Sequence, residues 1–119
     1  MVAENRRLAA PASVDSLPTS AMQEDHVSMG WGAARKLRRV VDNLSRILTV
    51  ELICAARGLE LRAPLTPAAA TDAVRALVRS VAGGAGPDRW LAPELAAVER
   101  LVRSGEAVVA AEVAAGALA

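Results

Sequence analysis

The stretch from Val27 to Arg57 contains no proline, and its apolar residues recur with the spacing of an α-helix. At about 100° per residue, one side of this helix is apolar and the opposite side is charged or polar. The apolar side consists of Ala33, Leu37, Val40, Val41, Leu44, Ile47 and Leu48. A helix of about 30 residues is roughly 45 Å long, which is more than a chain of 119 residues can cover. We therefore predict one long central helix that ends near Gly58 and needs partners from other segments.

The second half of this predicted helix, from Val50 to Ala56, is apolar on all sides, which is typical of a helix buried on every side. Glu51 lies within the apolar stripe, and an unpaired buried carboxylate is strongly destabilising. Its candidate partners are Arg57, Arg62 or a residue from another segment. Cys54 lies in the same half and is interpreted as a small buried apolar residue.

Three shorter helices are predicted after Pro64, each bounded by proline or glycine. They span residues 66–81, 93–103 and 106–117. The first begins with Thr66 as N-cap and Pro67 in its first turn, and the glycine-rich run 83–87 separates it from the second. Pro11 and Pro18 disfavour a helix over residues 1–20. No segment alternates apolar and polar residues as a strand does. We predict an all-α fold, with an extended loop over 1–26 and a single, partial helical region over 27–119.

The composition limits how stable such a fold is by itself. Apolar residues make up 53% of the chain, but Phe and Tyr are absent and there are two Trp. Aromatic side chains bury the largest areas, so a core of Ala, Val and Leu stabilises a domain of this length weakly. This composition indicates a chain that packs against a partner.

Charge and residue counts argue against several classes of protein. The net charge of +1 is too small for a nucleic-acid binder. No apolar run reaches the ~20 residues of a membrane span, and the N-terminus has no apolar run typical of a signal peptide. His26 and Cys54 are too few for a structural zinc site, so no metal is expected. A single cysteine is typical of a cytoplasmic protein. The basic run 35–39 is interpreted as a solvated or subunit-facing helix side, and residues 88–90 as a structural anchor.

The most informative polar stretch is Gln23-Glu24-Asp25-His26, at the expected junction between the extended loop and the long helix. It places an amide, two carboxylates and an imidazole at consecutive positions. These adjacent side chains cannot all face one ion on a helix, so the spacing is not that of a metal site. On the residues alone, the simplest interpretation is that the carboxylates oppose the dipole at the start of the long helix.

Residues 11–20, PASVDSLPTS, and 23–30, QEDHVSMG, closely resemble the aromatic amino acid lyase family, in the form of its histidine-specific branch. The similarity continues through Asp42-Asn43 and residues 61–64 to residues 86–93, and therefore covers nearly the whole chain. Met22 stands where the family usually has Asn.

The resemblance implies a piece of a larger helical-bundle lyase, a homotetramer that eliminates ammonia from L-histidine to give urocanate in histidine catabolism. It implies that Glu24 is the active-site carboxylate. Gln23, which sits beside Glu24, is a candidate to line the same substrate pocket. We expect structural roles near the site for Asp25, as a cap or ion-pair partner, and for His26, as a hydrogen-bonding residue at the junction between the loop and the helix. The family uses a methylidene-imidazolone electrophile, formed from an internal Ala-Ser-Gly. This sequence contains neither Ala-Ser-Gly nor Tyr, so it holds no cofactor and is expected to be inactive by itself.

Three interpretations of function stay open. The first is a C-terminal fragment of the histidine-specific lyase. Its partners would be the missing upstream lyase segment or the lyase subunits, and its substrate would be a small amino acid. A variant of this first interpretation is that the chain is a fragment of a related lyase or aminomutase that acts on tyrosine or phenylalanine. The second is a non-catalytic helical partner or modulator of an intact lyase, and the third is an unrelated helical interaction module. None of them involves nucleic acid or membrane, and all are compatible with the cytoplasm.

Overall fold

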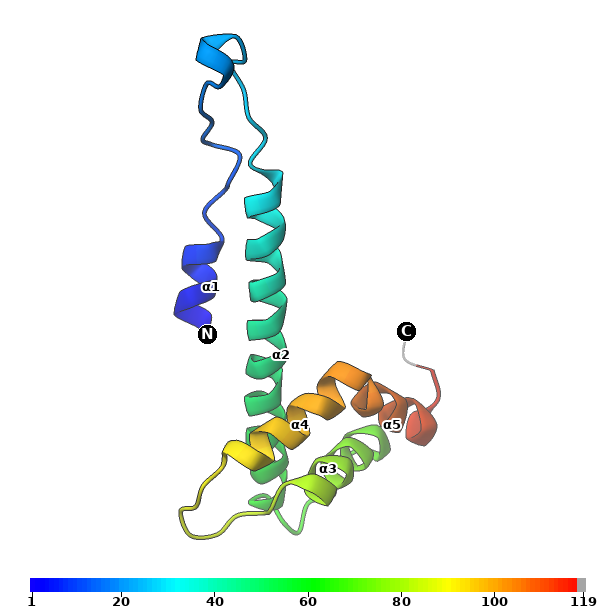
Figure 1. Cartoon of the computed structure of the whole chain (residues 1–119). Helices are drawn as coiled ribbons and strands as arrows, with labels where there is room; N and C mark the ends of the chain where they lie inside the picture. Colours follow the sequence, from blue (N-terminus) through cyan, green and yellow to red (C-terminus); the bar gives the residue numbers. More distant parts are fainter. Residues whose placement is uncertain (118–119) are drawn as a thin grey trace. The chain divides into compact units, whose positions relative to one another are not determined.

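The computed structural model describes residues 1–117, which form five α-helices, one short 3-10 turn and no strand (Figure 1). The elements are α1 (Val2–Leu8), η1 (Ser20–Met22), α2 (Gly30–Glu60), α3 (Ala69–Val81), α4 (Ala92–Ser104) and α5 (Glu106–Ala115). The predicted all-α fold and the long helix are confirmed. Among the described residues, no helix is both long and apolar enough to cross a membrane.

The chain forms two compact units, residues 1–44 and residues 45 onward. The boundary lies inside α2, and not at residue 26 where the extended loop was expected to meet the helical region. Two parts of α2 therefore belong to different compact units, which periodicity along one continuous helix does not reveal.

In the first unit, α1 is held beside the first part of α2 by polar contacts (Figure 1). Asn43 is 5% exposed, and its Nδ2 donates to Glu4 Oε2 at 2.9 Å and to Asn5 Oδ1 at 2.9 Å. Arg39 donates to Glu4 Oε1 at 2.8 Å. The hydrogen bond from Asn43, followed by the charge of Arg39, lowers the pKa of Glu4 below its usual value. The prediction of an extended segment throughout 1–26 is thus wrong for Val2–Leu8, because these tertiary contacts stabilise a helix too short to form alone.

Helix α2 begins at Gly30, three residues after the predicted start, and continues through Gly58 to Glu60. A glycine inside a helix costs about 1 kcal/mol relative to alanine, so Gly58 weakens the helix without ending it. Pro64 restricts the residue before it to non-helical conformations, and a turn precedes it.

The expected burial of α2 on every side after Val50 is not found in this chain. Ala56 is buried, but Val50 is 40% exposed, and Glu51 and Cys54 are also exposed. Glu51 therefore needs no buried partner, and the interpretation of Cys54 as a buried residue is wrong. The hydrophobic core of this unit takes Ala56 from α2, with Leu52 and Ile53 packed beside it, so the burial of this part of the helix is one-sided.

That core is small and consists of aliphatic side chains from α2, α3 and α4. It contains Ala56, Val78, Ala82 and Val98, with Leu52, Ile53 and Val74 packed against them. Helix α3 packs against α4 and α5, and Leu101 and Ala111 are buried as well. The three predicted shorter helices are confirmed, with changed ends.

Proline and glycine mark the two ends of α4, as expected from the sequence. Pro93 lies in the first turn of α4, and Gly105 ends it in the left-handed conformation with φ of 81°, as its lack of Cβ permits. Helix α3, in contrast, begins at Ala69 with no side-chain cap, so the prediction of Thr66 as N-cap is wrong. Thr66 and Pro67 belong instead to the connection before the helix.

Candidate functional site

The polar motif lies on a loop that precedes α2 and is closed at its base by one serine. Ser16 Oγ accepts a hydrogen bond from the Val27 amide at 2.8 Å and donates to the Val27 carbonyl at 3.2 Å. We call residues 16–27 the motif loop. Its two ends are thereby fixed to each other, so the residues between them have a defined conformation although η1 is the only helical element among them.

A second closure within the motif loop joins Thr19 and Glu24. The Thr19 amide donates to the Glu24 carbonyl at 2.9 Å, and the Glu24 amide donates to the Thr19 carbonyl at 3.3 Å. This pair forms an isolated antiparallel bridge. In addition, Thr19 Oγ1 donates to Glu24 Oε2 at 2.7 Å. Both the backbone and the carboxylate of Glu24 are therefore held by the same residue.

The turn between these two residues, η1, has an unusual backbone. Ser20, Ala21 and Met22 have φ of 54°, 54° and 69°, all in the left-handed region. This region costs residues other than glycine about 1–2 kcal/mol each, and asparagine tolerates it better than methionine. The Gln23 amide closes the turn by donating to the Ser20 carbonyl at 3.1 Å. Strain of this kind persists only where the surrounding contacts enforce it.

All four predicted site residues, Gln23, Glu24, Asp25 and His26, are exposed on the motif loop. Helix α2 starts at Gly30 and has no acidic residue in its first turn. The interpretation that these carboxylates oppose the helix dipole is therefore wrong, because that effect is confined to the first turn. No group of metal-binding side chains occurs in the part of the chain that the structure describes.

The motif loop can present an anionic group and an amide to a ligand. Among the described residues, Glu24 Oε1 has no hydrogen-bond partner, whereas Oε2 is occupied by Thr19. Glu24 can thus accept a proton or pair with a cationic or N–H group, and the neighbouring Gln23 offers both a donor and an acceptor. Sequence reasoning missed Thr19 and Ser16, although hydroxyl residues that flank a turn are a recognised source of such closures.

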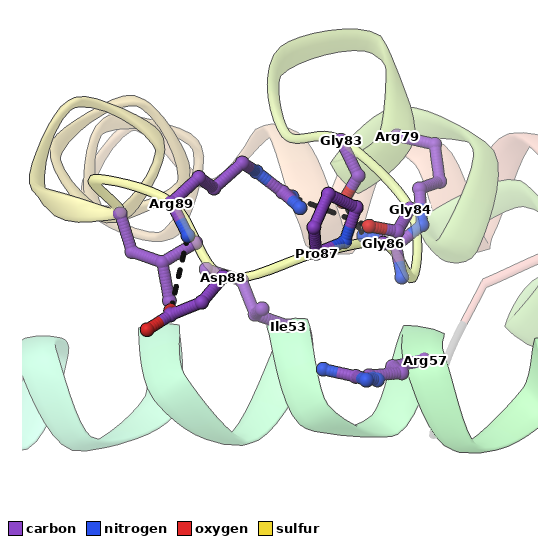
Figure 2. Close-up of a pocket in the computed structure, with 10 residues that line it drawn as sticks. Ile53, Arg57, Arg79, Gly83, Gly84, Gly86, Pro87, Asp88 and Arg89 are labelled. Atoms are coloured by element: carbon purple, nitrogen blue, oxygen red, sulfur yellow. Dashed lines mark hydrogen bonds between the residues drawn. The ribbon is translucent and has the colours of Figure 1, made fainter.

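A pocket in the second unit brings three arginines near a glycine-rich loop, but its polar groups serve the fold (Figure 2). Arg79 pairs with Glu60, at 3.1 Å from Nη2 to Oε2, and donates to the Gly83 carbonyl at 2.8 Å. Arg89 pairs with Glu94 at 2.6 Å and donates to the Gly84 carbonyl at 3.2 Å. These carboxylates neutralise the guanidinium groups of Arg79 and Arg89, so both arginines serve to fix the glycine-rich loop.

The same contacts explain the anchor predicted at residues 88–90. Arg89 fixes the loop after α3 to the start of α4, whereas Trp90 is 80% exposed and anchors nothing within the described chain. Hydrogen bonding lowers the pKa of Glu60, through Arg79, and that of Glu94, through Arg89. In turn, Glu94 raises the pKa of Arg89.

Comparison with known proteins matches this chain to an enzyme family, to histidine ammonia-lyases and to a tyrosine aminomutase. The aromatic amino acid lyase family model matches residues 1–80. Histidine ammonia-lyase from Streptomyces griseus is 61% identical over 122 residues, covering 100% of this chain and 24% of that protein. The crystal structure of histidine ammonia-lyase from Trypanosoma cruzi has a TM-score of 0.87 at 42% identity, covering 94% of this chain and 22% of that one. Tyrosine aminomutase from Streptomyces globisporus has a TM-score of 0.83 at 35% identity, covering 95% and 22%.

The fold and the motif loop define a helical segment of a lyase. The chain belongs to the aromatic amino acid lyase family. Its sequence is 61% identical to the histidine ammonia-lyase from Streptomyces griseus, and it spans about a quarter of the length of that protein.

Proposed function

We propose that this chain contributes the Gln23–Glu24 segment of a histidine ammonia-lyase active site, and that the complete enzyme eliminates ammonia from L-histidine to give urocanate. The observation that carries the proposal is the exposed motif loop, which holds Glu24 by one carboxylate oxygen and leaves the other available. The 61% identity to a protein named histidine ammonia-lyase supports histidine as the substrate.

The proposed role of Glu24 follows from the chemistry of the substrate. An imidazole ring carries an N–H donor and, when protonated, a positive charge, and both pair with a carboxylate. A carboxylate in contact with the substrate can also accept a proton during elimination. Gln23 is proposed to line the same pocket through its amide, while Asp25 and His26 support the loop.

The remaining chemistry is proposed to come from residues outside this sequence. The methylidene-imidazolone of the family supplies an electrophile for the substrate amino group. Residues 1–119 contain no Ala-Ser-Gly from which that group forms and no Tyr to act as a base. The chain therefore cannot hold the electrophile, and its own contribution is limited to binding, orientation and proton exchange at Glu24.

The proposed partner is the rest of the lyase, assembled as a homotetramer in the cytoplasm. Leu37 and Leu44, which helical periodicity puts on one side of α2 in the first unit, are 64% and 48% exposed. Contiguous apolar surface of this kind marks an interaction site. Because the matched relative is about four times as long as the matched segment, the remaining lyase chain is the occupant that fits this surface.

A hybrid enzyme tests the proposal directly. In the Streptomyces griseus histidine ammonia-lyase, the segment that aligns with this chain is replaced by residues 1–119, and product formation from L-histidine, L-tyrosine and L-phenylalanine is measured. We expect urocanate from L-histidine and little product from the other two. Turnover mainly of tyrosine or phenylalanine would assign the segment to a related lyase or aminomutase. An inactive hybrid, together with altered turnover when residues 1–119 are added to the intact lyase, would favour a modulator.

A further inference from the structure

Thr19 contacts the candidate catalytic carboxylate with its side chain as well as its backbone. Its Oγ1 donates to Glu24 Oε2 at 2.7 Å, in addition to the two backbone hydrogen bonds of the bridge. The backbone bonds alone join the two ends of the turn. The hydroxyl therefore adds one specific effect, which is to fix the direction of the Glu24 side chain.

This direction matters because an exposed glutamate otherwise populates many rotamers. Fixing a long side chain in one rotamer costs conformational entropy. When the side chain is already fixed before the substrate binds, its reactive group is better oriented for the reaction. With Oε2 held by Thr19, the oxygen that faces a ligand is Oε1, which has no hydrogen-bond partner among the described residues. The two oxygens of Glu24 thus have different roles.

We propose that Thr19 is a positioning residue for Glu24, whose hydroxyl holds one carboxylate oxygen so that the other meets the substrate. The proposal rests on the function proposed above, and it adds a residue that acts through Glu24 without touching the substrate. It predicts that removal of the hydroxyl lowers the turnover number even though the loop stays closed by its backbone.

The chain offers a clean substitution for this test. Thr19 has an extended backbone, with φ of −126° and ψ of 175°, which valine adopts readily. Thr19→Val in the hybrid lyase keeps the side-chain shape and removes the hydroxyl. From the usual strength of a hydrogen bond to a charged group, we expect kcat to fall by about 10- to 150-fold. Thr19→Ser, which keeps the hydroxyl, should restore kcat to within about twofold. Thr66→Val, at an exposed position before α3, controls for loss of a threonine hydroxyl elsewhere.

A double-mutant cycle with Glu24→Ala distinguishes positioning from general damage. If Thr19 acts through Glu24, Thr19→Val has no further effect on kcat once the carboxylate is absent. An equal loss in both backgrounds would overturn the proposal, as would a Thr19→Ser variant as slow as Thr19→Val.

If Glu24→Ala itself leaves kcat unchanged, the proposed function of Glu24 fails and the role of Thr19 fails with it. If Glu24→Ala is slow while Thr19→Val is normal, Glu24 keeps its proposed role and the positioning role alone is contradicted.

Discussion

Asn43, buried in the middle of α2, donates a hydrogen bond to Glu4 in α1, although the two residues are 39 positions apart in the sequence. A second hydrogen bond from the same amide nitrogen reaches Asn5. A seven-residue helix is marginal by itself, so these contacts are what hold α1 in place.

Asn43→Ala should therefore release α1 while leaving α2 intact. We expect the amide hydrogens of α1 to exchange at least about tenfold faster, since the hydrogen bond to the charged Glu4 and the one to Asn5 are both lost. Hydrogen exchange followed by mass spectrometry measures this change. Arg35→Ala, an exposed substitution on the same helix, should leave the exchange of α1 as it was, and equal exchange in both variants would contradict the role of Asn43.

Met22→Asn should stabilise the motif loop. Met22 has φ of 69°, where asparagine is tolerated far better than methionine, so the expected gain is about 1 kcal/mol in the free energy of unfolding. The family resemblance also places Asn at this position. Urea-induced unfolding provides the measurement, and Val14→Asn, at an exposed position that does not have a positive φ, should give no such gain. Destabilisation by Met22→Asn would argue against the left-handed turn.

The second unit should lose stability in acid. The pKa of Glu60 is lowered by its hydrogen bond with Arg79, and that of Glu94 by its hydrogen bond with Arg89, relative to an ordinary value of 4.5. A carboxyl group whose pKa is lower in the folded state stabilises that state above the unfolded pKa, and this contribution disappears as the pH falls through the folded pKa. We expect a thermal midpoint that is nearly constant from pH 7 to about 5 and that falls below about 4.5. Glu60→Gln and Glu94→Gln should each flatten this fall, and an unchanged pH profile in both variants would contradict the assignment.

The exposed apolar side of α2 should make the isolated chain self-associate or bind an apolar dye. Leu37 and Leu44 are about half exposed or more, at 64% and 48%, and exposed apolar patches of this kind drive association. Sedimentation velocity and dye fluorescence measure the two effects, and a Leu37→Glu, Leu44→Glu double variant should reduce both. A monomer with a cooperative thermal transition and no dye binding would contradict the expectation.

The parts of the fold that could be predicted from sequence are those set by local patterns. The absence of proline and the apolar period predict α2, and Pro93 and Gly105 predict the bounds of α4. Helix α1 could not be predicted because it depends on Asn43, far away in the chain. The left-handed turn was equally inaccessible, because Ser20, Ala21 and Met22 include no glycine or asparagine.

For the site, the sequence singled out Gln23 and Glu24 through the family resemblance, but the physical interpretation of the carboxylates was wrong. It assumed that α2 starts beside them, whereas the helix starts six positions after Glu24. The contact between Thr19 and Glu24 depends on the left-handed turn at residues 20–22, which lies between them. Spacing in the sequence alone therefore did not reveal it.

The central claim is that Glu24 contacts the substrate, and the turnover of Glu24→Gln in the hybrid lyase tests it most directly. Gln keeps the shape of the side chain and removes the ionisable oxygen, so kcat for urocanate formation should fall by roughly 10²–10⁴. Asp25→Asn, at the next exposed position of the motif loop, is the matched control and should retain kcat within about twofold of the unsubstituted hybrid, as is usual for a surface change. A large fall for Glu24→Gln alone is the result predicted here. Equal losses in the two variants, or normal turnover of Glu24→Gln in an active hybrid, would contradict the assignment of Glu24 to the active site.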